Sequence, residues 1–197
     1  MNIYWHYIKL ILTGFTAILI PAYWYNYGPQ NFLWLSDIGL FLTVIALWMD
    51  SPLIMSITAV GILSGELAWN IDFFSKIILN SFTTGMSDYM FSSAYPIALR
   101  ALSGFHIALP IIWILYLAHY GYDKQAIYYF IVLYWIVLLV TYLYTDPVKN
   151  INWVFLPQTL GIQTISPLMW VIFLAIFFPL LICLPTHYVF TKVFKIL

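Results

Sequence analysis

The chain has 197 residues, of which 64% are hydrophobic and only 7% are charged. Globular domains carry roughly 25% charged residues, so the composition excludes a soluble fold that hides all this apolar surface from water. The seven basic and seven acidic residues balance, which leaves no positive field for nucleic acid, and we predict no nucleic-acid partner.

Six apolar segments along the chain approach the length of a membrane-spanning helix, which needs about 20 residues. They cover residues 4–25, 31–49, 52–71, 96–118, 126–145 and 167–190. Tyr and Trp residues flank both ends of the first segment, as in an interfacial aromatic belt, so we expect a retained span rather than a signal peptide. The sequence therefore predicts an all-α polytopic membrane protein, in which residues 1–197 form a single bundle of six transmembrane helices.

The connections between these segments differ greatly in length. Residues 72–95 and 146–165 form two long connections on one side, and the turns on the other side are short. Long connections are typical of functional lids or re-entrant segments. Six spans place both termini on one side, which receives four of the seven Lys and Arg residues. The positive-inside rule then favours cytoplasmic termini, and we expect the inner membrane of a bacterium.

Polar side chains in or beside the spans gather in one half of the membrane. Burying such a group in lipid costs free energy, so each is expected to have a hydrogen-bonding or ionic partner or a functional role. A count at about 1.5 Å of rise per residue places them in the half under the two long connections. The residues that matter most are Ser36, Asp37, Glu66, Asn70, Arg100, His106 and Asn152. This one-sided cluster is the strongest indication of function in the sequence.

Structural roles would explain part of the cluster. A buried ion-pair network would hold helices together, and we expect Arg100 to pair with Asp72, Asp88 or Glu66. Asn70 suits hydrogen bonding between helices. The aromatic residues along the spans are expected to face lipid or to fill helix interfaces.

Ser36 and His106 are the candidates for catalysis. A serine becomes a nucleophile when a neighbouring base takes its proton, and histidine is the usual base. The two residues lie at similar depth, so they meet if the second and fourth spans are neighbours. The sequence has no HxxxH, HExxH or CxxC pattern and no glycine-rich phosphate loop, so we predict no metal and no cofactor.

The segments around these two residues resemble a known arrangement. Residues 31–41 (NFLWLSDIGLF) look like the nucleophile segment, and residues 100–106 (RALSGFH) like the histidine segment, of six-span intramembrane hydrolases of the androgen-induced protein type. Residues 145–153 resemble the polar end of helix five in a related six-span family that includes a phospholipid acyltransferase. Those families use a Thr or Cys on helix two with a His on helix four, and this chain departs from them in having Ser36.

The resemblance implies a lipid-ester hydrolase or acyltransferase embedded in the membrane, with membrane lipids as partners and a lipid or fatty-acyl substrate. Ser36 would attack the acyl carbonyl, and His106 would take its proton. The groups available to orient His106 or to bind the oxyanion are Glu66, Asn70 and Asn152.

Two other interpretations stay open, and Asp37 bears on one of them. Asp37 follows Ser36 directly, so the two side chains diverge by about 100° on a helix and Asp37 is a poor direct partner. If Asp37 faced the site, a carboxylate there would suit a cationic ligand or a proton better than an ester. That arrangement would favour a non-enzymatic carrier or binding protein. The third interpretation is a structural membrane subunit in which the cluster only fixes helix packing.

Overall fold

Helices account for nearly all of the chain. The computed structural model describes residues 3–197, and within them the only β pairing is an isolated bridge between Tyr122 and Ile196. The α-helices are α1 (Ile3–Tyr27), α2 (Leu35–Trp48), α3 (Pro52–Leu79), α4 (Ile97–Ala101), α5 (Phe105–Tyr120), α6 (Ala126–Tyr144), α7 (Leu156–Thr159), α8 (Pro167–Phe178) and α9 (Leu184–Val193). Shorter helical turns are η1 (Pro29–Leu33), η2 (Asp88–Phe91), η3 (Leu102–Gly104), η4 (Pro147–Lys149), η5 (Ile151–Trp153) and the π-helical η6 (Pro179–Cys183).

Five helical stretches are long and apolar enough to cross a membrane. They are Ile3–Tyr27, Pro52–Leu79, Ile97–Tyr120, Ala126–Tyr144 and Pro167–Val193. Much of their apolar surface is exposed, most of all on the last stretch, where only 17% of the most hydropathic window is buried. Such a surface is stable only against lipid. The chain is therefore an integral, multi-pass, all-α membrane protein, as the composition predicts.

Two of the predicted spans differ from the structure by four residues or more at one end. The second helix begins at Leu35 rather than at 31, because Gly28 turns the chain with a φ of 79° and Pro29 opens a 3₁₀ turn. The third helix runs on to Leu79 rather than ending at 71. Asp72 does not stop it, because the loop that follows the helix hydrogen-bonds the Asp72 carboxylate.

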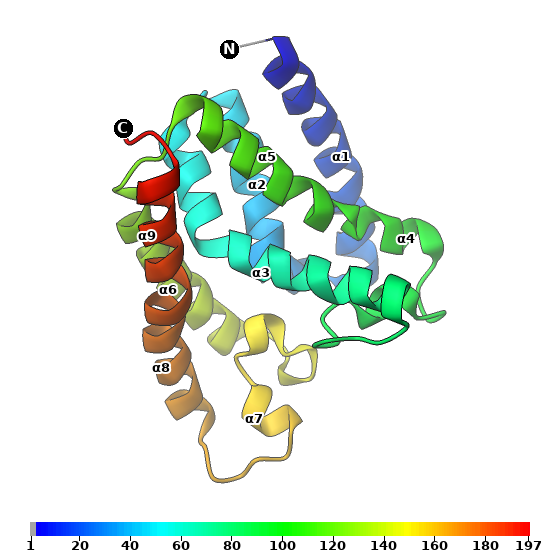
Figure 1. The fold of residues 1–197 in the computed structure, drawn as a ribbon. Coiled ribbons are helices and arrows are strands. Elements are labelled where there is room, and N and C mark those ends of the chain that lie inside the picture. The colour runs from blue at the N-terminus through cyan, green and yellow to red at the C-terminus, as the bar shows by residue number, and fades with distance from the viewer. Residues whose placement is uncertain (1–2) are drawn as a thin grey trace.

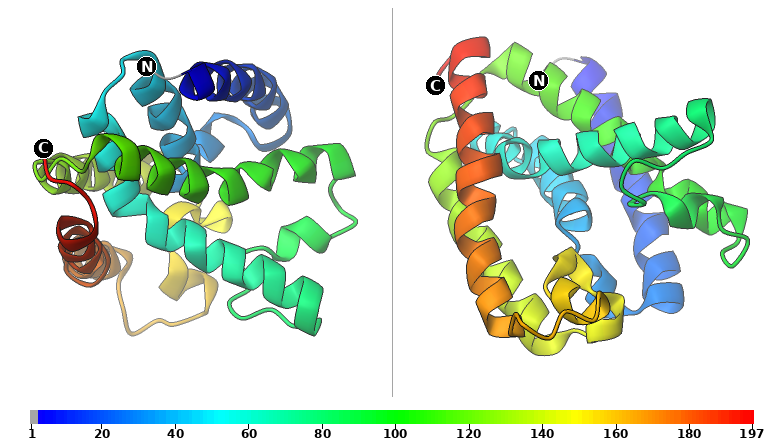
Figure 2. Two further views of the ribbon diagram at one scale, coloured as in Figure 1. Left: turned by 45° about the horizontal axis from the view of Figure 1, so that its top comes forward. Right: turned by 60° about the horizontal axis from the view of Figure 1, so that its bottom comes forward.

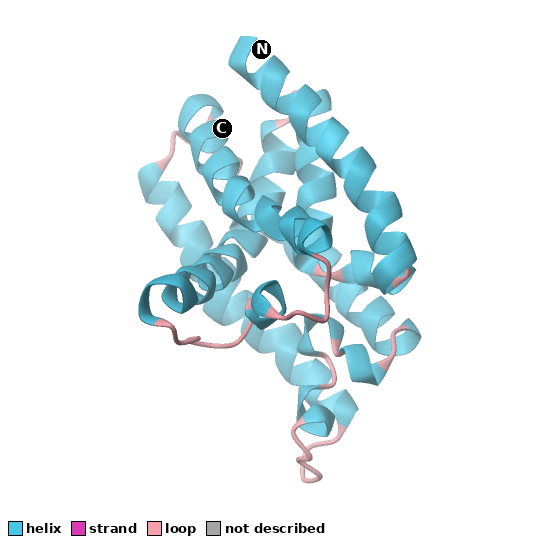
Figure 3. Ribbon diagram, turned by 90° about the vertical axis from the view of Figure 1, so that its right-hand side faces the viewer, coloured by secondary structure: helices cyan, strands magenta, loops and turns pink. Residues whose placement is uncertain are grey.

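The helix α3 is central to the packing. It contacts α2, α5, α6 and α9, which lie around it (Figure 2). The start of α1 and the end of α9 lie at the same end of the molecule (Figure 1). The longer loop stretches lie toward the opposite end (Figure 3). The two ends of the bundle are therefore different, as the unequal connections predict.

A buried hydrogen bond fixes α2 against α5. The indole Nε1 of Trp113 donates to Oγ1 of Thr43 at 2.7 Å, and both residues are fully buried. Gly39 lets the Trp113 ring approach, because a Cβ at this position would lie 3.3 Å from the ring. The second and fourth predicted spans are therefore neighbours, which is the condition for Ser36 and His106 to meet.

Close packing of α3 on α6 generates a prediction about stability. A Cβ built on Gly61 would lie 2.0 Å from the buried ring of Phe130. We expect Gly61→Ala to lower the free energy of unfolding by about 1–3 kcal/mol, as overpacked cores do. Thermal unfolding in detergent micelles measures the change. The control is Gly65→Ala on the same helix, where nothing lies within 4 Å. Equal stability of the two variants would contradict this packing.

Candidate functional site

A cavity of about 510 Å³ lies among α1, α2, α3, α5 and the two long connections. Five residues of the predicted cluster line it, namely Ser36, Asp37, Glu66, His106 and Asn152. The first long connection contributes Met86, Tyr89 and Tyr95, and the second contributes residues 148–149 and 151–153. The cavity thus lies where the unequal connections and the polar cluster predict it.

His106 is held by an acid inside this cavity. Its Nδ1 lies 2.6 Å from Oε2 of Glu66, which is 2% exposed, and this is the only ion pair among residues 3–197. The imidazole ring stacks on Trp69 at 4.5 Å and on Phe105 at 4.2 Å between centroids. The contact with Glu66 favours the tautomer that carries its proton on Nδ1, which leaves Nε2 as an acceptor.

Asn70 supports this arrangement from behind the cavity. Its amide donates to the backbone carbonyl of His106 at 2.7 Å and to that of Glu66 at 2.8 Å. Asn70 does not line the cavity. It is therefore a link between α3 and α5, as predicted for an interhelical amide, and it ties together the two residues of the pair.

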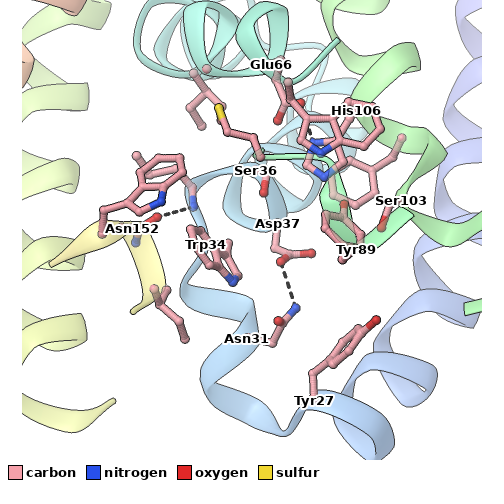
Figure 4. A pocket seen from close by; sticks show the side chains of 18 of the residues that line it. Tyr27, Asn31, Trp34, Ser36, Asp37, Glu66, Tyr89, Ser103, His106 and Asn152 are labelled. Carbon is pink, nitrogen blue, oxygen red and sulfur yellow. Dashed lines mark hydrogen bonds and ion pairs between the residues drawn. The ribbon is translucent and has the colours of Figure 1, made fainter. Parts of the chain in front are cut away.

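Ser36 and Asp37 occupy the first turn of α2. In Figure 4 Ser36 lies between Asp37 and the Glu66–His106 pair, and the Asp37 carboxylate points toward Asn31. Ser36 is half-buried, and its hydroxyl forms no hydrogen bond within the described chain. Asp37 is only 2% exposed; its Oδ2 accepts a hydrogen bond from Asn31 at 3.2 Å, and its Oδ1 has no partner. Both the serine and the carboxylate are thus available to a ligand.

Asn152 positions this turn of α2 from the second long connection. Its Oδ1 accepts from the backbone N–H of Leu35 at 3.1 Å, and its Nδ2 donates to the carbonyl of Leu33 at 2.7 Å. Asn152 itself has a φ of 50°, in the left-handed region that Asn tolerates better than most residues. Its side chain is engaged by α2 rather than by His106.

Arg100 does not pair with a carboxylate, so that prediction is wrong. Its Nη1 donates to the carbonyl of Met90 at 2.7 Å, and it does not line the cavity. The expected acids have other roles, since Glu66 holds His106 and Asp88 is exposed. Asp72 is taken by the loop that follows its own helix. Arg100 instead joins α4 to the first long connection.

Asp72 organises the loop that covers the cavity. Its two carboxylate oxygens accept six hydrogen bonds of 2.6–3.0 Å from backbone and hydroxyl groups. The donors are Thr83, Thr84, Gly85 and Ser87. The signal in the sequence is the TTGMS stretch, which supplies backbone and hydroxyl donors a short distance after an acid in the last two turns of α3.

The aromatic side of the cavity was not predicted from the sequence. Tyr23, Tyr27, Trp34, Tyr89 and Tyr95 all line it, whereas the aromatic residues were expected only at lipid or in packing. Partial burial raises the pKa of Tyr89, in the first long connection, so its hydroxyl stays protonated and can donate a hydrogen bond. Aromatic residues cannot be divided between lipid and cavity without knowledge of which way each helix faces.

No protein-family model, no curated protein and no solved structure matches the chain.

The Asp72 contacts predict the order of the covering loop. We expect Asp72→Ala to increase amide hydrogen exchange across residues 83–87 by at least tenfold, because six hydrogen bonds lose their acceptor. Hydrogen exchange followed by mass spectrometry measures this change. Asp88→Ala, at an exposed acid in the same connection, should leave exchange at 83–87 unchanged. Unaltered protection in the Asp72 variant would contradict the assigned role.

Proposed function

We propose that the protein is an intramembrane lipid-ester hydrolase or acyltransferase that uses Ser36 as nucleophile and His106 as base. The observation that carries the proposal is the 2.6 Å contact between His106 and Glu66 in a cavity that Ser36 also lines. Serine, histidine and a carboxylate that orients the histidine are the three parts of a nucleophilic triad, which is recognised by geometry rather than by fold.

The reaction follows from the free groups. Nε2 of His106 takes the proton of the Ser36 hydroxyl as Oγ attacks the carbonyl carbon of the lipid ester. The tetrahedral intermediate expels the alcohol, which receives that proton from His106, and an acyl-serine remains. Water or an acceptor alcohol then attacks the acyl-serine, with His106 again as base. The second tetrahedral intermediate expels the Ser36 oxygen, which receives the proton from His106, and the fatty acid or the new ester is released. Glu66 stabilises the imidazolium in both halves.

Ser36 and His106 share no hydrogen bond among the described residues. The serine side chain must turn toward Nε2 as substrate binds, and such catalytic contacts are often long before it does. The neutral hydroxyl of Tyr89 in the cavity wall is a donor for the oxyanion.

A carrier or binding protein is the second candidate function. Asp37 supports it, because a buried carboxylate with an unpartnered Oδ1 lines the same cavity. Such a group suits a cation better than an ester carbonyl. Turnover of lipid esters by the purified protein separates the two functions, because an enzyme that uses Ser36 and His106 cleaves the ester and a carrier leaves it intact.

A six-span topology belongs to the same proposal. The helix α2 has 14 residues, about 21 Å at 1.5 Å per residue, and η1 extends it toward the long connections. An even number of spans places both termini on one side of the membrane, and we propose that this side is the cytoplasm of a bacterium. The β-bridge from Ile196 to Tyr122 supports this, because it brings the C-terminal end to the short turn between α5 and α6.

The catalytic roles predict the behaviour of two variants. Ser36→Ala should lower kcat for a fatty-acyl ester by about 10³-fold or more, because the nucleophile is lost. Glu66→Gln should lower it by about 10²–10⁴-fold, because an amide no longer fixes the tautomer or stabilises the imidazolium. Fatty-acid release from lipid vesicles measures both.

Ser64→Ala is the matched control, since Ser64 lies on α3 and bonds to Thr186 rather than lining the cavity. Full activity is expected for it. A folded Ser36→Ala protein that retained its turnover would overturn the proposed mechanism.

The topology is tested by cysteine labelling. Cys183 is fully buried and is the only cysteine, so Cys183→Ala gives a background for single exposed cysteines at Tyr4, Ser81 and Leu197. We expect labelling of the first and last from the cytoplasmic side, and of Ser81→Cys from the other side. Opposite accessibility of Tyr4→Cys and Leu197→Cys would refute six spans. Reversal at all three positions would refute only the orientation.

A further inference from the structure

The first turn of α2 carries a carboxylate that the catalytic scheme does not use. Asp37 is 2% exposed and lines the cavity. Its Oδ1 is buried without a hydrogen-bond partner, and its Oδ2 accepts only one hydrogen bond, from Asn31. A carboxylate accepts up to about four hydrogen bonds, so most of the acceptor capacity of Asp37 is unused beside the cavity.

The basic side chains nearby do not satisfy this carboxylate. Lys149 lines the cavity, but its ammonium donates to the backbone carbonyl of Tyr27. Arg100 donates to the carbonyl of Met90. Nδ1 of His106 is engaged by Glu66. A buried carboxylate without a partner is costly unless it takes up a proton or a cation. Within residues 3–197 the chain supplies no cation, and a bound ammonium group would fill that role.

Aromatic rings surround the same part of the cavity. Tyr23, Tyr27 and Tyr95 form a continuous row in edge-to-face pairs, with centroids 5.1 and 5.7 Å apart. The hydroxyl of Tyr23 is held by Ser103 at 2.9 Å, which fixes its ring. Figure 4 shows Tyr27 and Trp34 on the Asp37 side of the cavity. Ring faces attract ammonium groups through their quadrupole, so aromatic walls and a free carboxylate together match a cation.

We propose that the substrate is an amine-bearing lipid and that Asp37 and these rings bind its ammonium group. The inference rests on the proposed function for the ester end of the substrate and names the head group. Because Asp37 adjoins Ser36, the bound amine lies within one helical turn of the nucleophile. The carboxylate then acts as a specificity determinant, and it rejects anionic head groups by repulsion.

Binding to a catalytically silent protein tests the head group separately from the reaction. The probes are dihexanoyl phosphatidylethanolamine, dihexanoyl phosphatidylglycerol and free ethanolamine, titrated by calorimetry into the Ser36→Ala protein in detergent. We expect the ethanolamine lipid to bind at least tenfold more tightly than the glycerol lipid, and also at least tenfold more tightly than free ethanolamine. Adding Asp37→Asn should remove the preference between the two lipids.

Asp50→Asn in the same Ser36→Ala background is the control. Asp50 is an exposed acid in the turn after the other end of α2, with a φ of 47° that Asn tolerates. It should leave the preference intact. Equal affinity for the two lipids, or a preference that survives Asp37→Asn, would overturn the inference. If Asp37→Asn fails to fold, the comparison of lipids on Ser36→Ala decides alone.

The remaining outcomes separate the two proposals. Tight binding of free ethanolamine that matches the lipid would keep the amine site but overturn the assignment to a lipid. Amine preference in a protein that releases no fatty acid would overturn the proposed hydrolase or acyltransferase and leave the binding site. Ester turnover without amine preference would overturn only the inference.

Discussion

The buried contact between Glu66 and His106 is the interaction on which the rest of the site depends. Glu66 is 2% exposed, and a carboxylate buried in a membrane protein is costly without a partner. His106 supplies that partner, and Trp69 and Phe105 stack against its ring. Because Glu66 is on α3 and His106 on α5, the pair also fixes the two helices at the depth of the cavity. The same contact therefore orients the imidazole and stabilises the bundle.

The nucleophile is placed by a different set of contacts. Thr43 and Trp113 hold α2 against α5, and Asn152 caps the start of α2 from the second long connection. Asp72 shapes the first long connection. Both long connections thus contribute structure at the cavity, whereas the turns at the other end are short. A change at Asn152 would act on Ser36 through the backbone of Leu33 and Leu35.

The sequence was sufficient for the features that depend on hydropathy and depth. Apolar segment lengths located five long helices, and counting residues along them placed Ser36, His106 and Glu66 around one cavity. The prediction failed where direction mattered. Arg100 was assigned an acid, but helix rotation gives it the carbonyl of Met90. The α2 boundary shifted because hydropathy does not distinguish the 3₁₀ turn that begins at Pro29 from the first turn of an α-helix.

Asp37 is a second residue whose side-chain direction could not be predicted from the sequence. A 100° step along a helix separates adjacent side chains, yet the cavity is wide enough for both Ser36 and Asp37 to line it. The aromatic wall was equally hidden, because tyrosines at a membrane boundary and tyrosines around a ligand have the same sequence pattern. The lack of a cationic partner for Asp37 depends on what the nearby basic side chains bind, and those partners are not evident from the sequence.

The activated serine is the central claim, and covalent labelling tests it most directly. A fluorophosphonate probe reacts with a serine whose proton is taken by a neighbouring base. Mass spectrometry of the digested protein should locate the adduct on Ser36, and Glu66→Gln should slow its formation. An adduct on Ser103 instead, or no adduct on a folded protein, would contradict the account.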